Sequence, residues 1–396
     1  MPSYFTSAPG KVILFGEHAV VYGKLATAGS LGLRSYALVQ SRTDGALEVN
    51  LPDVQLVRSW KSADIPRQAR WEGYPYPPPA MNVELLDQLT KFVDLGTQTN
   101  RSVAAIALLY LHSYLTSDDI ANQGYDLSVR SDLPVGAGLG SSASYSVCLA
   151  TALLKLNGHL SESLSAADQR DLVNQWAFQA EKVIHGNPSG IDNTVSTLGG
   201  AVIFKKGEKI EPLPGFQSLK FILTNTRVPR ETQVLVANVR KLREKFPSVV
   251  NPMLDSINEI SISCKQLFAQ NGEDRAHLLS RFGDLVDVNH GMLAALGVSH
   301  PTLEKVREIS SKLGLKSKLT GAGGGGCALT LVRDDMDEKT VEELKTKLGE
   351  QGFEVLEAQV GGPGAGFVTL DSVTSIAEFL SRGTADLETQ TWTYFV

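Results

Sequence analysis

The sequence of 396 residues predicts an α+β protein built from two domains. This length allows two or three domains at about 100–200 residues each. A half-buried strand expected at residues 125–133 leads into a glycine-rich loop and then a helix, and the chain closes with an expected strand, helix and strand. The composition changes at residues 212–215, which predicts an N-terminal domain of residues 1–215 and a C-terminal domain of residues 216–396.

The hydrophobic patterns predict the elements of the first domain. Asn100 is the expected cap of one helix, and Ser165 and Asp168 are spaced as a capping box before another. Residues 60–80 hold five prolines, which predicts a loop. Strands are expected at residues 12–15, 37–40 and 125–133, and helices at residues 101–115, 142–156 and from 165 to about 184.

The second domain is expected to begin with a strand at residues 219–224, followed by several helices up to about residue 312. A strand at 327–332, a charged helix at 338–348 and a strand at 353–359 complete the α+β pattern. The sequence shows no internal repeat, so a repeat architecture is excluded.

The composition excludes several classes of protein. With 37 basic and 43 acidic residues the formal charge is −6, so the overall field attracts neither nucleic acid nor an anionic membrane. Cys148, Cys264 and Cys327 are too few and too widely spaced for a disulfide framework or a zinc cluster. The longest uncharged run, residues 133–154, begins with Pro134 and glycines and is not expected to cross a membrane. We expect a cytoplasmic protein with reduced thiols.

Glycine is the one residue in excess, with 36 positions. Twelve of these glycines lie in three stretches, at residues 134–144, 321–326 and 361–366. Because glycine has no Cβ, it allows the backbone to turn sharply or to approach a ligand closely. The three stretches are therefore the first candidates for a functional site.

The stretch at residues 134–144 leads from a strand into a helix, so free N–H groups and the helix dipole meet at one point. This predicts a phosphate site, with a tight turn of incidental glycines as the alternative. Ser141 stands where a Walker A loop needs lysine and where a Rossmann fingerprint needs its third glycine, so both motifs are excluded. Ser141 and Ser142 can offer hydroxyls to a phosphate or to Mg²⁺, or they can cap the helix.

Two carboxylates lie further along the chain. Asp192 is expected on a loop, because residues 185–193 are rich in turn formers. It can cap a turn or accept a proton from a substrate. Glu181 lies at the edge of a helical apolar stripe, where the residues alone favour a solvated rim charge over a metal ligand.

Residues near the N-terminus offer a further group. Lys11 is expected at the start of an apolar strand, and Glu17 and His18 follow its end, so both ends can face one cleft. Taken alone, a solvated lysine and a local Glu–His contact are favoured. The stretch at residues 318–327 is more informative, because five glycines in six positions cost ordering entropy that only a close backbone approach justifies.

Three segments resemble, in order, the three motifs of the GHMP small-molecule kinases. They are residues 8–11 (Ala-Pro-Gly-Lys), 134–143 and 320–326. The resemblance covers nearly the whole chain apart from residues 60–80 and the tail after Phe367. It implies a two-domain α+β fold of the GHMP kinase type, with the active site in the cleft between the N- and C-terminal domains.

The resemblance also implies the chemistry, which is transfer of the ATP γ-phosphoryl group to an alcohol with Mg²⁺ as cofactor. Asp192 matches the catalytic aspartate of the family, and Lys11 matches the lysine that keeps it ionised. Ser142 and Glu181 match the Mg²⁺ contacts. The loop expected to hold the ATP phosphates comprises Pro134, Gly136, Ala137, Gly138, Leu139, Gly140, Ser141, Ser142 and Ala143. The third motif comprises Gly321, Ala322, Gly323 and Gly324.

Two further segments, residues 16–23 and 176–193, resemble the family members that phosphorylate the 5-hydroxyl of (R)-mevalonate on the way to isoprenoids. The substrate carboxylate needs a cation, which His18 or Arg230 can provide. The residues that this resemblance places near the substrate are Lys11, Glu17, His18, Tyr145, Asp192, Arg230 and Thr232.

Several alternatives share the glycine motifs. Family members that act on phosphomevalonate, homoserine or galactose would keep them, and so would a metabolite-binding regulator without catalysis. The resemblance further implies a homodimer and inhibition by prenyl diphosphates at the ATP site. No nucleic acid or membrane partner is expected.

Overall fold

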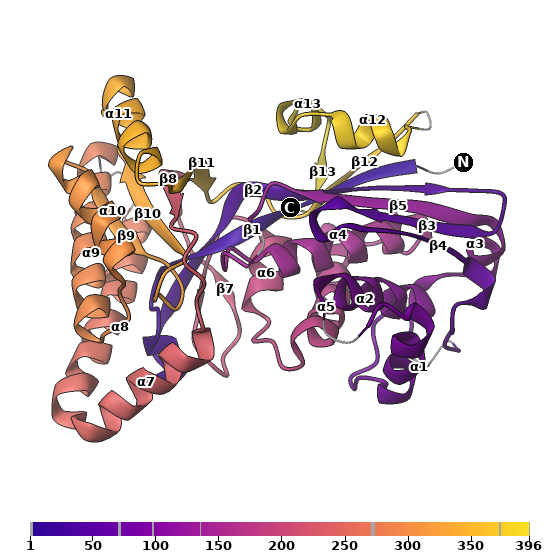
Figure 1. The fold of residues 1–396 in the computed structure, drawn as a ribbon, viewed down its shortest axis with the longest axis horizontal. Helices are drawn as coiled ribbons and strands as arrows, with labels where there is room; N and C mark the ends of the chain where they lie inside the picture. Colours follow the sequence, from indigo (N-terminus) through magenta and orange to yellow (C-terminus); the bar gives the residue numbers. More distant parts are fainter. Residues whose placement is uncertain are drawn as a thin grey trace.

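The computed structural model describes residues 3–69, 73–96, 99–134, 136–270, 274–371 and 374–395. Its strands form one continuous sheet that runs through both halves of the molecule, with helices on its faces (Figure 1). Within these ranges no helix is long and apolar enough to cross a membrane. The strands are β1 (Ser3–Phe15), β2 (Ala26–Ser41), β3 (Ala46–Leu51), β4 (Leu56–Lys61), β5 (Gly124–Ser131), β6 (Ala201–Phe204), β7 (Glu211–Pro212), β8 (Leu219–Asn225), β9 (Lys316–Leu319), β10 (Cys327–Val332), β11 (Glu354–Val360), β12 (Gly366–Thr369) and β13 (Thr393–Tyr394).

Most of the helices follow one another in runs between these strands. They are α1 (Val83–Val93), α2 (Asn100–Leu115), α3 (Asp118–Gln123), α4 (Ser141–Leu156), α5 (Ala166–His185), α6 (Ile191–Leu198), α7 (Thr232–Lys245), α8 (Pro247–Ala269), α9 (Arg275–Ala295), α10 (Pro301–Lys312), α11 (Glu338–Gly349), α12 (Ile376–Ser381) and α13 (Thr384–Glu388). Short 3₁₀ helices span Ala19–Tyr22, Pro52–Val54 and Ser62–Asp64.

β1 and β2 form a long antiparallel hairpin that both halves share (Figure 1). Residues 35–41 of β2 pair with β5, residues 26–29 pair with β6, and Leu31 pairs with Val360 of β11. From β11 the sheet continues through β8 and β10 to β9 in the C-terminal half. The hairpin therefore fixes the two halves of the sheet to each other.

Both faces of the N-terminal part of the sheet are covered. Ala37 and Val39 of β2 belong to the core formed with α2, α4 and α5, and the intervening Leu38 faces the other side. There α12 and α13, yellow in Figure 1, bring Phe379 against the sheet. The tail after Phe367, to which the sequence analysis assigned no role, thus closes the second face.

The C-terminal part of the sheet is also covered on both faces. Leu223 of β8 packs in a core with α8 and α9, whereas the neighbouring Ile222 packs in a core with α10 and α11. Phe282 of α9 meets Phe15 at the end of β1, with ring centroids 5.1 Å apart. The end of the shared hairpin is therefore buried in the C-terminal half.

The glycine stretch at residues 361–366 carries the chain from β11 in the C-terminal half back to β12 in the N-terminal half. Arg34 of β2 holds it, because Nη1 and Nη2 donate to the carbonyl oxygens of Pro363 (2.8 Å) and Gly364 (2.7 Å). A Cβ on Gly364 would lie 2.2 Å from the carbonyl oxygen of Thr197 in α6. These glycines therefore allow two protein backbones to approach each other.

The boundary predicted at residues 212–215 falls between β7 and β8. The last elements of the chain return to the N-terminal half, where β12 pairs with β1. The division into domains of residues 1–215 and 216–396 stays a prediction.

Some predicted boundaries differ from the structure. The strand expected at residues 12–15 begins at Ser3, because the register shifts between Pro9 and Gly10 and so lets the strand pass through a proline. The helix expected to be capped by Asn100 is capped by Thr99, whose hydroxyl accepts from the N–H of Ser102. A short apolar run and a single cap residue were therefore too local to set these boundaries.

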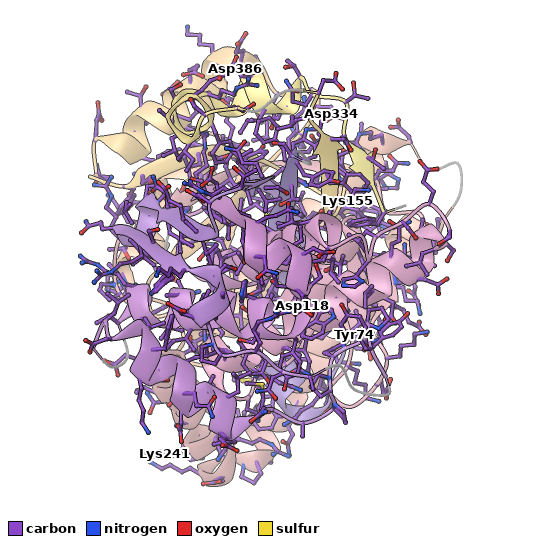
Figure 2. The ribbon with its side chains drawn as sticks, turned by 90° about the vertical axis from the view of Figure 1, so that its right-hand side faces the viewer. Tyr74, Asp118, Lys155, Lys241, Asp334 and Asp386 are labelled. Atoms are coloured by element: carbon purple, nitrogen blue, oxygen red, sulfur yellow. The ribbon has the colours of Figure 1, made fainter. Side chains whose placement is uncertain are left out.

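The proline-rich segment is a loop beyond residue 64 wherever it is described, although its first residues, Trp60 and Lys61, end β4. It lies along α5, because Trp176 Nε1 donates to the carbonyl oxygen of Pro75 at 2.7 Å. Tyr74 of this segment is visible on the face shown in Figure 2. Residues 70–72 lie outside the described residues.

Replacing Arg34 with methionine should lower the free energy of unfolding by about 2–4 kcal/mol, because the buried guanidinium makes three hydrogen bonds, including one to Ser7 Oγ at 2.7 Å. Urea unfolding of both proteins measures the change. Arg58→Met, at an exposed position of β4, is the matched control and should change stability little. Equal losses in the two variants would contradict the role given to Arg34.

Candidate functional site

A cavity of about 980 Å³ is lined by residues of both halves. A smaller cavity of about 210 Å³ includes Glu181 and shares Asp192 and His185 with the larger one. The structure therefore brings most of the predicted site together. The predicted residues that line the larger cavity are Lys11, Gly136, Gly138, Gly140, Ser141, Ser142, Tyr145, Asp192, Arg230, Thr232, Gly321 and Ala322.

The first glycine loop leads directly into α4. Gly140 has φ 75° and occupies the N-cap position without any side-chain cap, and the helix begins at Ser141. Both serines therefore lie inside the helix, and the cap interpretation of Ser141 and Ser142 is wrong. Because the first N–H groups of a helix lack partners within it, the start of α4 suits an anion.

Other residues of this loop are buried and hold the loop in position. Ala137, Leu139 and Ala143 are buried, and the Leu139 carbonyl oxygen accepts a hydrogen bond from the backbone N–H of Lys11 at 2.7 Å. Together with Pro134 they do not line the larger cavity. They position the loop, while Gly136, Gly138 and Gly140 face the cavity; residue 135 lies outside the described part of the chain.

Lys11 and Asp192 form an ion pair on the cavity wall, with Nζ 3.1 Å from Oδ1. Lys11 lies within β1 and its side chain is only 11% exposed, so the expectation of a solvated lysine at a strand start is wrong. Asp192 lies in the first turn of α6 and not on a loop, because Gly190 adopts φ 79° and starts the helix there. The dipole of α6 favours a carboxylate at this position.

Glu181 of α5 is buried, so its interpretation as a solvated rim charge is wrong. Its Oε1 accepts from Ser146 Oγ at 3.1 Å, and its Oε2 lies 3.5 Å from Ser142 Oγ. Burial raises the pKa of Glu181 to about 7, and the nearby charge of Asp192 contributes to the increase. The site therefore holds a carboxylate whose negative charge is poorly compensated.

His185, one turn after Glu181, was not assigned a role from the sequence. Its Nε2 lies 3.0 Å from Ser142 Oγ and 3.9 Å from Glu181 Oε2. The spacing of four residues on one helix was the available signal, since it places both side chains on one face. His185 fixes the position of the Ser142 hydroxyl.

Ser142 and Glu181 fit a magnesium site. Both offer the hard oxygen donors that Mg²⁺ prefers, and a cation beside Glu181 would offset its buried charge. Among the described residues, no cluster of three or more His, Cys, Asp and Glu side chains could hold a metal by itself. Mg²⁺ commonly binds through one or two protein oxygens together with substrate phosphates, so these residues suit an ion that is shared with a nucleotide.

Arg230 connects two glycine motifs across the cavity. A Cβ on Gly138 would lie 1.0 Å from Arg230 Nη2, and one on Gly321 would lie 3.0 Å from Nη1. Nη1 also lies within hydrogen-bond distance of the Thr320 carbonyl oxygen, at 3.4 Å. Burial lowers the pKa of Arg230. Thr232, the first residue of α7, lines the same wall.

The third glycine motif has two parts. Gly321 and Ala322 line the cavity. Gly323 and Gly324 pack away from it, because a Cβ on Gly323 would lie 2.0 Å from the carbonyl oxygen of Val298. Only the first part of the motif therefore reaches the cavity.

Glu17 and His18 were expected near the substrate, but neither lines the larger cavity. Glu17 is buried in contact with Lys318 and Asn289. Nε2 of His18 lies 2.9 Å from the Ala322 carbonyl oxygen, and burial lowers the pKa of His18. Both residues therefore lie behind the third motif.

Tyr145 does line the cavity, and burial raises its pKa. Its hydroxyl donates to the carbonyl oxygen of Ala104 at 3.0 Å. Because its hydroxyl is already bonded, Tyr145 lines the cavity with its aromatic ring and not with a free hydroxyl.

The far end of the cavity was not predicted from the sequence. This end combines apolar side chains with a carboxylate and a hydroxyl, from segments that share no sequence motif. The residues are Leu51, Asp53, Val54, Asn100, Val103, Ala104 and Ser131. The parallel pairing of β3 with β5 places Leu51 near Ser131, and α2 supplies Asn100, Val103 and Ala104.

Comparison with known proteins identifies the family. Residues 101–200 match the GHMP kinases N terminal domain, and residues 273–352 match the GHMP kinases C terminal domain. The mevalonate kinase of Homo sapiens is 42% identical over 384 residues, which cover 93% of this chain and 95% of the human protein. The chain belongs to the mevalonate kinase family of GHMP kinases. This membership identifies an ATP-dependent kinase that acts on an alcohol.

Other relatives agree with this result. The mevalonate kinase of Candida albicans is 39% identical over 408 residues, covering 95% of this chain and 93% of that protein. The crystal structure of Methanococcus jannaschii mevalonate kinase has a TM-score of 0.68 at 23% identity, covering 90% of this chain and 98% of that one. The Leishmania major mevalonate kinase in complex with R-mevalonate has a TM-score of 0.66 at 21% identity, with coverages of 90% and 96%. The predicted two-domain GHMP kinase fold is confirmed.

Glu181→Gln should stabilise the metal-free protein at high pH. Between its ordinary pKa of 4.5 and its folded value of about 7, the folded protein holds a proton that the unfolded chain has lost, so the stability falls as the pH rises through this window. We expect the variant to gain about 1–3 kcal/mol at pH 8 and little at pH 4.5.

Urea unfolding with a chelator at both pH values measures this gain. Glu208→Gln, in an exposed ion pair with Lys205, is the control and should change little at either pH. A gain for Glu181→Gln that is equal at pH 4.5 and pH 8 would contradict the raised pKa.

Proposed function

We propose that the protein transfers the γ-phosphoryl group of ATP to the 5-hydroxyl of (R)-mevalonate, giving (R)-5-phosphomevalonate and ADP. The proposal depends on one observation above all, the Lys11–Asp192 ion pair in the same cavity as the start of α4. Catalysis of phosphoryl transfer depends mainly on positioning the reactants and neutralising their charge, and little on covalent bonds between substrate and protein. A regulator that only binds a metabolite would not need this pair. The substrate follows from the names of the relatives.

The phosphates of ATP would bind at the start of α4, where the N–H groups and the dipole of the helix favour anions. Ser142 and Glu181 would hold Mg²⁺, which neutralises charge on the phosphate oxygens when bound. His185 would keep the Ser142 hydroxyl in place through the 3.0 Å contact. The phosphates would then lie beside the Lys11–Asp192 pair.

Asp192 would hold the hydroxyl of the acceptor and take its proton as the new oxygen–phosphorus bond forms. The bond between the γ-phosphorus and the bridging oxygen breaks, and ADP leaves with that electron pair. Lys11 lies 3.1 Å from Asp192, so it orients the carboxylate and offsets negative charge on the transferring group. In this proposal both residues touch the reacting atoms.

The carboxylate of mevalonate would bind Arg230. The sequence left His18 and Arg230 as alternatives, and Arg230 is favoured because it lines the cavity whereas His18 lies behind Ala322 with a lowered pKa. A guanidinium can hold a carboxylate with two parallel hydrogen bonds. Thr232 on the same wall would offer a hydroxyl to the substrate.

The nucleoside of ATP would occupy the far end of the cavity. Leu51, Val54 and Val103 offer apolar contacts for a base, and Asp53 and Ser131 offer polar ones. The same apolar wall supports competition by prenyl diphosphates, which combine a diphosphate with an apolar chain. A homodimer and a cytoplasmic location stay predictions for this chain.

Asp192→Ala should reduce kcat by about 10²–10⁴ because it removes the proton acceptor, while nucleotide binding is retained. A coupled ADP-release assay gives kcat, and fluorescence titration with a labelled nucleotide gives the affinity. Asp171→Ala, at an exposed position of α5, is the control and should be fully active. Turnover within about threefold of wild type in Asp192→Ala would remove Asp192 from the mechanism.

A further inference from the structure

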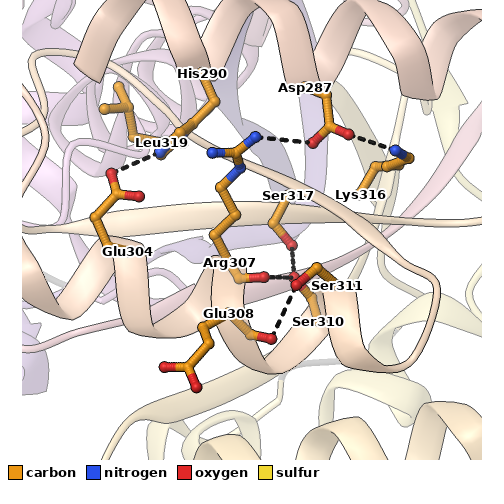
Figure 3. A network of polar contacts seen from close by, with 10 residues as sticks. All are labelled: Asp287, His290, Glu304, Arg307, Glu308, Ser310, Ser311, Lys316, Ser317 and Leu319. Carbon is orange, nitrogen blue, oxygen red and sulfur yellow. Dashed lines mark hydrogen bonds and ion pairs between the residues drawn. The ribbon is translucent and has the colours of Figure 1, made fainter. Parts of the chain in front are cut away.

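The strand that leads into the third glycine motif is held firmly by the C-terminal helices. Figure 3 shows β9 beside α9 and α10. The backbone N–H of Leu319 donates to Nδ1 of His290 at 3.2 Å, and Nε2 of the same ring contacts Glu304 at 2.9 Å. Ser317 Oγ donates to Ser310 Oγ at 2.6 Å. The start of the third motif is therefore fixed relative to these helices.

Lys318 lies between these residues on β9 and is not part of the network in Figure 3. Its side chain is 2% exposed, and Nζ contacts Oε1 of Glu17, whose side chain is 1% exposed. Nζ also donates to the Leu319 carbonyl oxygen at 2.8 Å. The second oxygen of Glu17 accepts from Nδ2 of Asn289 in α9 at 3.0 Å. A fully buried ion pair thus joins the turn after β1 to the C-terminal half.

Two further contacts join the same segments. The hydroxyl of Thr320 donates to the carbonyl oxygen of Ile13 at 2.9 Å and accepts from its N–H at 3.2 Å. His18, with the strained φ of 61°, reaches the Ala322 carbonyl oxygen. The third motif is therefore attached to both ends of a short segment that begins two residues after Lys11.

A buried ion pair is costly to form, because both charges leave water, and an apolar pair of similar volume often stabilises a protein as well. The Glu17–Lys318 pair therefore suggests a need for defined positions beyond general stability. The groups it positions are Gly321 and Ala322 on the cavity wall, together with Arg230, which packs on Gly321. Of these, Arg230 is the residue that the proposed function places against the carboxylate of mevalonate.

We propose that Lys318, acting through Glu17, is a positioning residue that sets the third glycine motif and Arg230 relative to Lys11 and so determines the affinity for the acceptor alcohol. Glu17 then affects the affinity for the substrate indirectly, through the position of the third motif. This inference rests on the proposed function, because it assumes that the acceptor binds at Arg230.

A double-mutant cycle tests the inference. Lys318→Met and Glu17→Gln each leave one buried charge without its partner, and each should raise the KM for mevalonate at least about tenfold while the KM for MgATP stays within about twofold. The double variant Glu17→Gln/Lys318→Met removes the same contact, so its KM for mevalonate should stay within about threefold of that of the more impaired single variant.

Lys316→Met is the matched control, because Lys316 lies on the same strand but pairs with Asp287 at the surface, and its KM values should not change. A double variant with the wild-type KM for mevalonate would show that the ion pair does not set the site and would overturn the inference. An unchanged KM for mevalonate in soluble Lys318→Met would also overturn it, since a purely structural role lowers only the active fraction.

If Lys318→Met does not fold, Asn289→Ala removes the other contact of Glu17 and should also raise the KM for mevalonate, and an unchanged KM in that variant would overturn the inference. The wild-type protein separates this inference from the proposed function. No ADP release by wild type with mevalonate would contradict the proposed function itself, whereas an active wild type with an unchanged KM in Lys318→Met would contradict only the role of Lys318.

Discussion

The pairing of β1 with β2 is the constraint on which the rest of the molecule depends. One end of the hairpin pairs with β5 and β12, and the other end pairs with β6 and lies against α9. Lys11 lies between these ends, and its backbone N–H binds the Leu139 carbonyl oxygen of the phosphate loop. The Thr320 hydroxyl binds Ile13 two residues later. A single strand therefore sets the positions of the lysine, the first glycine loop and the third glycine motif, so a displacement of β1 would disturb all three together.

The two cavities, which share Asp192 and His185, hold charges that the protein alone compensates poorly. Burial raises the pKa of Glu181 and lowers that of Arg230, so each residue bears a free-energy cost in its charged form. Bound ligands of opposite charge would offset these costs, since a cation would sit beside Glu181 and a carboxylate beside Arg230. The Lys11–Asp192 pair lies between them, and its two opposite charges compensate each other. In the proposed reaction, Glu181 would face the cation bound to the nucleotide, the Lys11–Asp192 pair would face the transferred phosphoryl group, and Arg230 would face the carboxylate of the small acid.

The sequence predicted the fold class and many of the residues that line the larger cavity, because glycine motifs encode local backbone conformations. Gly140 with its positive φ starts α4, as the strand–loop–helix pattern implied. Predictions failed where distant segments decide the environment: Glu181 appeared to lie at a helix rim, and only the packing of α5 against α4 buries it against Ser146. The resemblance placed Glu17 near the substrate. Its partner, Lys318, lies 301 residues away, so no local pattern reveals the pair. The far end of the cavity was missed for the same reason.

The proposed function is that this protein phosphorylates mevalonate in the cavity that holds Lys11 and Asp192. The most direct measurement is a coupled ADP-release assay with MgATP against (R)-mevalonate, phosphomevalonate, homoserine and galactose, with the phosphorylated product identified by mass spectrometry. The account predicts ADP release with (R)-mevalonate alone, in equal amount to 5-phosphomevalonate. Release with a different member of the panel would contradict the assignment of Arg230 and Thr232 to mevalonate, and no release with any of them would contradict the catalytic role of the Lys11–Asp192 pair.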